Sequence, residues 1–153
     1  MEVRRVSRSR GGTVSRLDAA FVAVIFVHLA VVLVHTVAHL ELQIVPGPVD
    51  LAFVLVVILI GPLASLPILR FNRPLASGIL AVLMVAAFAY GLQSHFLIAG
   101  PDNVSVVATN RWTFVFVVTA IGIGFLELIA VGVAAILFLR AVRNPSGHLG
   151  PRT

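Results

Sequence analysis

Residues 18–44 read DAAFVAVIFVHLAVVLVHTVAHLELQI, and this run determines the fold class of the chain. Its ionisable residues are few: Asp18 and Glu41 near the two ends, and three histidines between them. A helix rises about 1.5 Å per residue and needs about 20 residues to cross the roughly 30 Å hydrocarbon core of a bilayer. The run is long enough and apolar enough to do so, and it predicts a transmembrane helix.

Three further apolar runs follow, at residues 49–69, 75–98 and 112–139. Backbone polar groups cannot stay unpaired in lipid, so only helices or a closed barrel can span it. The runs are continuous and lack the short alternating strands typical of a barrel. Because the connections are short, neighbouring helices are expected to run antiparallel. The sequence therefore predicts an all-α polytopic membrane protein, an up-down bundle of four transmembrane helices occupying residues 18–140.

The composition supports a lipid environment and excludes several kinds of chemistry. Of the 153 residues, 59% are hydrophobic and 11% are charged, whereas about a quarter of a typical soluble domain is charged. The chain contains no cysteine and no lysine. Disulfides, thiolate metal sites and lysine Schiff bases are therefore excluded. No catalytic triad and no glycine-rich phosphate loop are visible, so any catalytic residues are unknown.

The distribution of arginine predicts how the chain lies in the membrane. Ten of the eleven arginines precede the first run, lie between the second and third, or follow the fourth, and only Arg111 lies on the opposite side. By the positive-inside rule, both termini of this multi-pass protein are expected on the cytoplasmic face of the cell membrane. Residues 1–17 are expected to be a disordered basic segment, and residues 141–153 a flexible tail.

The same distribution bears on the binding partners. The arginines are scattered over the two tails and one short turn, so nothing indicates binding to nucleic acid. The expected partner is the lipid bilayer. A homo-oligomer and a larger membrane complex both stay open.

The histidines of the first run lie along one narrow stripe. His28 and His35 are seven residues apart, and His35 and His39 are four apart, spacings that return to the same helix face. His95 lies near the outer end of the third run, at a depth similar to that of His35 and His39. We therefore expect His35, His39 and His95 to form a cluster near the outer face.

A second, deeper pair is predicted in the middle of the bundle. Glu127 lies well inside the fourth run, on the same face as the small residues Ala120, Gly124 and Ala134. Small residues let helices approach closely, so Glu127 is expected to face the bundle interior. His28 lies at a comparable depth in the first run. Because charge is costly at this depth, we expect Glu127 to be protonated or to pair with His28.

Three interpretations of the histidine cluster are open. His35, His39 and His95 could bind a transition metal (Zn, Cu or Fe), or His35 or His39 together with His95 could bind haem b. A peptidase-type zinc site is disfavoured, because HTVAH has Thr36 where H-E-x-x-H has glutamate. Alternatively, the histidines could be interhelical hydrogen-bonding groups in a structural or accessory subunit of a membrane complex. In the third interpretation, the cluster, His28 and Glu127 form a proton relay or part of a transporter.

Overall fold

The computed structural model describes residues 15–143, and it is helical apart from the connecting turns and loops. No strand occurs within these residues. Four helical stretches are long and apolar enough to cross a membrane: Arg16–Glu41, Pro48–Phe71, Arg73–Leu97 and Thr113–Arg143. The prediction of an all-α protein with four helices long and apolar enough to span a membrane is confirmed. Residues 1–14 and 144–153, where most of the predicted disordered start and flexible tail fall, lie outside the described residues.

Helix α1 (Arg16–Glu41) begins and ends with recognisable capping motifs. Ser15 and Asp18 form a reciprocal capping box at its start, which satisfies two backbone N–H groups. At its end the backbone N–H of Gln43 bonds to the carbonyl of Leu40, and that of Ile44 to the carbonyl of His39. This pattern is a Schellman motif, with Gln43 in the left-handed region at φ 57°. The helix therefore ends before residue 44, where the apolar pattern ends.

The second span is continuous but contains two kinds of helix. Helix α2 (Pro48–Phe53) leads into the π-helix η1 (Val54–Ile60), and α3 (Gly61–Phe71) follows. The backbone N–H of Gly61 bonds to the carbonyl of Val56, five residues earlier. Pro62 comes next and cannot donate a backbone hydrogen bond, and a proline ring crowds the preceding turn of an α-helix. The wider π turns end where this proline enters the helix.

The third and fourth spans differ from the predicted ranges mainly at their ends. Helix α4 (Arg73–Leu92) continues into a second π-helix, η2 (Gln93–Leu97). Helix α5 (Thr113–Arg143) extends past residue 139, so residues 141–143, expected in the flexible tail, are helical. A loop over residues 98–112 joins η2 to α5. Because α5 carries Arg140 and Arg143 in its last turn, these cations lie where the helix dipole favours them.

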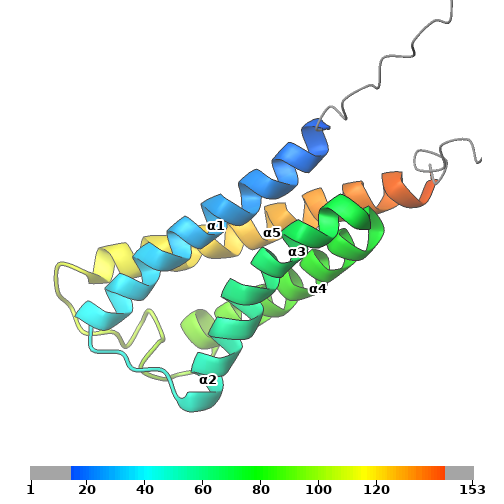
Figure 1. Cartoon of the computed structure of the whole chain (residues 1–153). Helices are drawn as coiled ribbons and strands as arrows, with labels where there is room; N and C mark the ends of the chain where they lie inside the picture. The colour runs from blue at the N-terminus through cyan, green and yellow to red at the C-terminus, as the bar shows by residue number, and fades with distance from the viewer. Residues whose placement is uncertain (1–14, 144–153) are drawn as a thin grey trace, which may run out of the picture.

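The long helices pack side by side (Figure 1). Helix α5 contacts both α1 and α4, and α3 packs on α4. Helix α1 meets the second span mainly through α3 and diverges from α2. We call the end of the bundle with the start of α1 and the end of α5 the arginine end. The histidine end is the opposite one, where α1 stops and α5 starts. At the arginine end, the guanidinium of Arg73 at the start of α4 donates to the carboxylate of Asp18 in α1.

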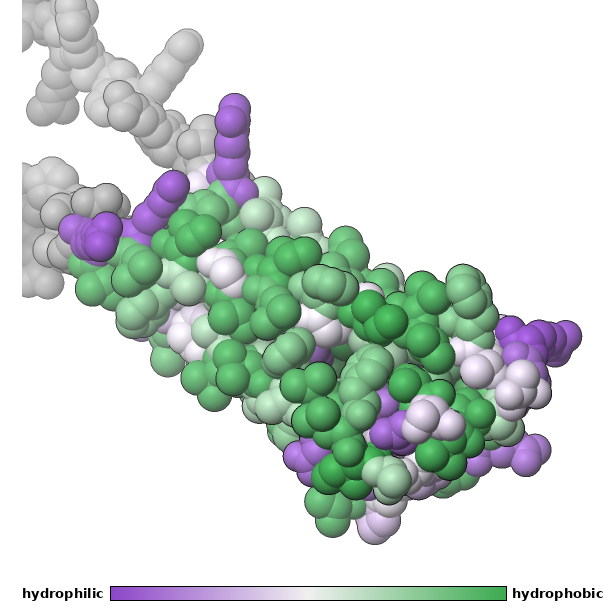
Figure 2. Space-filling view, turned by 180° about the vertical axis from the view of Figure 1, so that it is seen from behind, coloured by the Kyte–Doolittle hydropathy of each residue, from purple (hydrophilic) through white to green (hydrophobic). Residues whose placement is uncertain are grey.

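The surface has the polarity expected of a chain in a bilayer. Figure 2 shows hydrophobic residues along the whole length of the visible face, with hydrophilic residues gathered at the two ends. Phe26, Val82 and Phe125, from three different helices, are 55%, 70% and 64% exposed. The interior near the arginine end is packed by apolar side chains such as Phe21 and Leu80. Large apolar side chains thus occupy both the core and the flanks of the bundle.

Candidate metal centre

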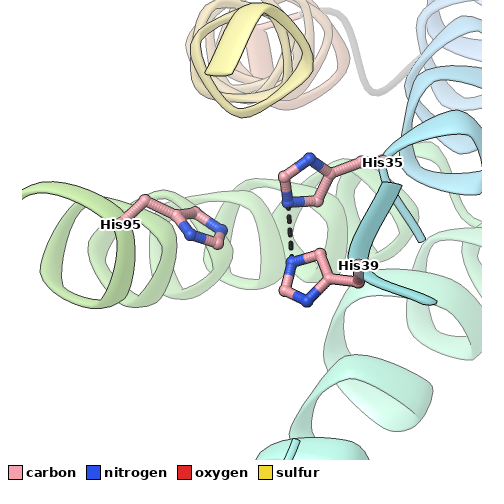
Figure 3. A group of neighbouring side chains, drawn as sticks. All are labelled: His35, His39 and His95. Carbon is pink, nitrogen blue, oxygen red and sulfur yellow. Dashed lines mark hydrogen bonds between the residues drawn. The ribbon is translucent and has the colours of Figure 1, made fainter. Parts of the chain in front are cut away.

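Three histidines from two separate segments meet at the histidine end (Figure 3). His35 and His39 lie one turn apart in the last part of α1, and His95 lies in η2. Each offers one ring nitrogen such that the three atoms lie within 4.8 Å of one another. The structure thus brings together the three residues that the sequence pointed to, in a cluster that could hold a metal ion. We refer to these three residues as the histidine cluster.

The nitrogens of His35 and His39 are spaced much as two ligands of one metal ion would be. Nε2 of His35 and Nε2 of His39 are 3.0 Å apart and share a hydrogen bond. Two ligands of a tetrahedral ion are separated by about 3.3 Å when each metal–nitrogen bond is about 2.0 Å. The His95 nitrogen lies within 4.8 Å of both atoms, so binding one ion would require it to move toward the other two rings by up to about 1.5 Å.

The Nδ1 atom of His35, which points away from His39, is held by a hydrogen bond to α5. Nδ1 of His35 lies 2.8 Å from Oγ1 of Thr119. The Thr119 hydroxyl donates its own hydrogen to the carbonyl of Val115, at 2.6 Å. With the hydroxyl hydrogen directed at Val115, the Thr119 oxygen is the acceptor, which assigns the proton of the neutral His35 ring to Nδ1. Nε2 of His35 is left with a lone pair directed into the cluster.

Asp102, in the loop before α5, supports the other two histidines. Nδ1 of His95 lies 3.0 Å from the backbone carbonyl of Asp102 and donates to it. Nδ1 of His39 lies 3.6 Å from Oδ1 of the Asp102 side chain. That carboxylate oxygen is buried and has no hydrogen-bond partner among the described residues. An acceptor therefore lies near the Nδ1 atom of every histidine in the cluster.

The loop that carries Asp102 is itself held in place by hydrogen bonds. The backbone N–H of Val104 donates to the carbonyl of His95 at 3.0 Å. The side-chain amide of Asn103, a buried residue, donates to the carbonyl of Ile98 at 2.9 Å. These bonds tie the loop back to the end of η2. Asp102 is thereby positioned relative to His95.

A fully buried aromatic ring closes one side of the cluster. Phe116, near the start of α5, has 0% of its surface exposed. The ring of His35 stacks on it, with centroids 4.9 Å apart and an interplanar angle of 23°. The rings of His39 and His95 lie 5.1 and 5.4 Å from it. The orientation of all three imidazoles is therefore restricted by packing as well as by hydrogen bonds.

No protein-family model, curated protein or solved structure matches this chain. The chemistry of the cluster must therefore be argued from its own residues.

The deeper polar pair is also brought together. Nε2 of His28 lies 3.5 Å from Oε1 of Glu127, and their side chains are 1% and 3% exposed. Neither ring nitrogen of His28 has a hydrogen-bond partner within residues 15–143. Glu41, which lies near the end of the first apolar run, is exposed at the end of α1. The two expected polar groupings are thus present as two separate sites along the bundle.

Two supporting residues had little signal in the sequence. Thr119 is one of many small residues in an apolar helix, and only its position opposite His35 gives it a role. Asp102 follows Gly100 and Pro101 in a segment typical of a turn, and it does lie in a turn. Its seven-residue distance from His95 is the one feature that indicated a contribution to the site.

Proposed function

We propose that this chain is a membrane protein that binds one transition-metal ion through His35, His39 and His95. The proposal rests chiefly on the Nδ1 atoms of His35 and His95, which are paired with oxygen acceptors, and on the Asp102 carboxylate 3.6 Å from Nδ1 of His39, an arrangement that leaves the Nε2 atoms for an ion. Metal-bound histidines almost always donate their other ring N–H in this way, and the partner fixes the orientation of the ring. Neutral imidazoles suit Zn, Cu and Fe alike.

Metal binding would change which ring nitrogen of His39 carries the proton. Without an ion, the hydrogen bond between the two Nε2 atoms uses a proton on Nε2 of His39, because Nε2 of His35 carries a lone pair. Nδ1 of His39 then faces the Asp102 carboxylate with a lone pair of its own. An ion bound at Nε2 would place the His39 proton on Nδ1, where it can bond to that carboxylate. Metal binding thus supplies the buried oxygen of Asp102 with a donor.

The packing of the three rings favours a metal ion over haem b. A bis-histidine haem requires its flat macrocycle to lie between the two imidazoles. The His95 ring lies 5.0 Å from the His35 ring and 5.8 Å from the His39 ring, edge to face in both cases. A single ion fits among three rings in mutual contact with far less movement of the helices than a macrocycle requires.

The two other interpretations have weaker support. Interhelical hydrogen bonding accounts for the contact between His35 and Thr119, but it does not require three imidazoles to converge. A proton relay would have to connect the histidine cluster to Glu127, which lies about 12 Å along α5 from Thr119 at helical rise. The residues that line the space between the histidine cluster and Glu127 include Val32, Ala87 and Gly124. None of these residues carries a group that could transfer a proton.

The orientation and location of the protein are part of the proposal. The arginines near both termini and in the turn between α3 and α4 support a cytoplasmic arginine end. The histidine end then faces outward, in the cell membrane, and the metal is taken up from that side. The chain acts alone, as a homo-oligomer or within a larger membrane complex, and the metal site requires no residue from another chain.

The metal content of the purified protein tests this function. The chain would be purified in detergent without chelator, and elemental mass spectrometry should find about one Zn, Cu or Fe per chain. His39→Gln and His95→Gln should lose the ion, because each removes one of three ligands. His28→Gln is the matched control, since it changes a buried histidine of the same helix outside the cluster, and it should retain the ion.

The same variants separate metal binding from a structural role. Circular dichroism and size-exclusion chromatography should show that His39→Gln keeps its helices and stays monodisperse. A wild-type chain free of metal, or a His39→Gln variant with full metal content, would overturn the proposal.

A further inference from the structure

A large cavity adjoins the histidine cluster and extends into the bundle. Its volume is about 620 Å³, and it is lined by residues of α1, α2, η1, α4, η2 and α5. Small-molecule sites typically enclose about 300–1,000 Å³. The histidine cluster lines one part of the cavity and Glu127 another, and the wall between them is largely apolar, as at Ile58 and Ala87. The cavity has the size and polarity of a site for a mainly hydrocarbon molecule.

The rim of the cavity lies on the apolar flank of the bundle. Leu40 and Leu51, which line it, are 69% and 45% exposed, and Phe125 and Leu128 are 64% and 49% exposed. In a bilayer these side chains face the hydrocarbon core. A molecule dissolved in the lipid can therefore enter the cavity without passing through water.

An ion held by the three histidines would have its remaining coordination position on the side of this cavity. Phe116 covers one side of the histidine cluster and does not line the cavity. Thr119 and Asp102 occupy the Nδ1 sides of the rings. A tetrahedral ion held by three histidines keeps its fourth position for water or a substrate. With Phe116 and Thr119 on the other sides, the fourth position of such an ion would point toward the cavity.

We propose, on the basis of the metal function above, that the cavity binds a lipid-soluble molecule with a hydrocarbon body and one terminal oxygen ligand. The oxygen of this head group, an alcohol, carbonyl or carboxylate oxygen, occupies the fourth position on the ion. The hydrocarbon body lies against the apolar wall between the histidine cluster and Glu127. The carboxyl group of Glu127 is next to His28, so the pair marks the deep end of the cavity.

A pair of glycine variants tests this assignment. Gly91 lines the cavity, and a Cβ added there meets no atom within 4 Å. Gly91→Leu should therefore narrow the cavity without disturbing the helices. Gly132 in α5 offers the matched control, because an added Cβ there also meets no atom within 4 Å and the residue does not line the cavity.

The first measurement uses the Co²⁺-loaded protein and two hydroxamic acids that differ in chain length. Acetohydroxamate supplies a metal-binding head group alone, whereas octanohydroxamate adds a hydrocarbon chain. From the change in the visible cobalt spectrum, the wild type and Gly132→Leu should bind octanohydroxamate at least about ten-fold more tightly than acetohydroxamate. In Gly91→Leu, with its cobalt content unchanged, this preference should disappear. Equal preferences in all three proteins would overturn the proposal.

A second measurement does not depend on the metal. A diazirine-bearing octanol should label cavity residues of the wild type and of Gly132→Leu, in competition with octanol, and should not label them in Gly91→Leu. Labelling that is spread over the lipid-facing side of all the helices and is not competed would mean that bilayer chains alone fill the cavity. That result would overturn the proposal whether or not metal is bound. A wild type without Co²⁺ would contradict the metal function and the oxygen contact, while the labelling would still decide whether the cavity is a site.

Discussion

Asp102 supports two histidines in two different ways. Its backbone carbonyl accepts a hydrogen bond from His95, and its side-chain carboxylate lies beside Nδ1 of His39. A substitution that changes the side chain therefore removes one of these supports and keeps the other. This separation makes the contribution of the carboxylate measurable by itself.

Asp102→Asn should weaken metal binding by about ten-fold or more, the usual effect of losing a hydrogen-bonding partner of a metal ligand. Asparagine keeps the size and the backbone carbonyl but loses the charge that favours the proton on Nδ1 of His39. Competition with a chelator of known affinity would measure the change. Asp50→Asn is the control, because Asp50 accepts a hydrogen bond from Tyr90 and is not part of the histidine cluster. Equal affinities of wild type and Asp102→Asn would contradict the role of the carboxylate.

Thr119→Val should also lower the affinity for the ion by about ten-fold. Valine has nearly the shape of threonine but no oxygen, so the N–H on Nδ1 of His35 would lose its acceptor in a buried place. Thr119→Ser restores an oxygen and should bind nearly as well as the wild type in the same competition measurement. A serine variant as weak as the valine variant would indicate that packing, and not the hydrogen bond, is what Thr119 supplies.

At the residue scale, the sequence predicts the histidines better than their partners. His35 and His39 follow from helical spacing, because residues four apart share a face. Thr119 could not be predicted, since its role depends on the rotation of α5 relative to α1. Asp102 was ambiguous because a turn segment rich in Gly, Pro, Asp and Asn is expected whether or not it serves a site.

At the scale of the helices, the two π segments have a direct effect on the site. Helix η2 contains His95, and η1 contributes Ile58 to the cavity. A π turn changes the direction in which the following side chains point, and such turns are often found at functional sites. The apolar pattern shows where a helix runs but contains no signal for an extra residue in one turn. The spans were therefore predictable, but the π segments were not.

Gly61, directly after η1, is expected to be intolerant of any side chain. A Cβ added there would lie 2.6 Å from Cδ1 of Leu83 and 2.9 Å from the carbonyl oxygen of Val56. The contact with the backbone cannot be relieved by a rotamer change, so Gly61→Ala should destabilise the bundle by about 1–3 kcal/mol. Thermal unfolding in detergent should show a lower midpoint.

Gly78→Ala is the control for this effect. It lies in α4 with nothing within 4 Å of the added Cβ, and alanine favours helix over glycine. Its unfolding midpoint should be equal to or above that of the wild type. An unchanged midpoint for Gly61→Ala would mean that α3 and α4 are packed more loosely than described.

For the molecule as a whole, the absence of cysteine allows a direct test of orientation. Val106, in the loop at the histidine end, is 59% exposed, and Phe71, at the end of α3, is 83% exposed. In intact cells a membrane-impermeant maleimide should label Val106→Cys, and it should label Phe71→Cys only after permeabilisation. The cysteine-free parent chain gives the background. The reverse labelling pattern would place the histidine end in the cytoplasm.

The number of spans follows from length and hydropathy because lipid admits few alternatives. The cavity does not follow from these properties. It arises where α1 and η1 diverge at the histidine end, and the angle between two helices depends on side-chain packing along their full length. Leu40 and Leu51 are ordinary apolar residues in the sequence, and only the three-dimensional arrangement makes them part of a rim.

The histidine cluster joins segments that are far apart along the chain, and this has a consequence for folding. An ion held by α1 and η2 would close a loop containing the whole second span and α4, as a disulfide would in a chain that had cysteines. Closing a long loop removes conformational freedom from the unfolded chain, and a ligand that binds only the folded form stabilises it further. The metal would then act as a reversible cross-link between α1 and η2. The concentration of the ion at the membrane surface would therefore determine how stable the packing of the histidine end is.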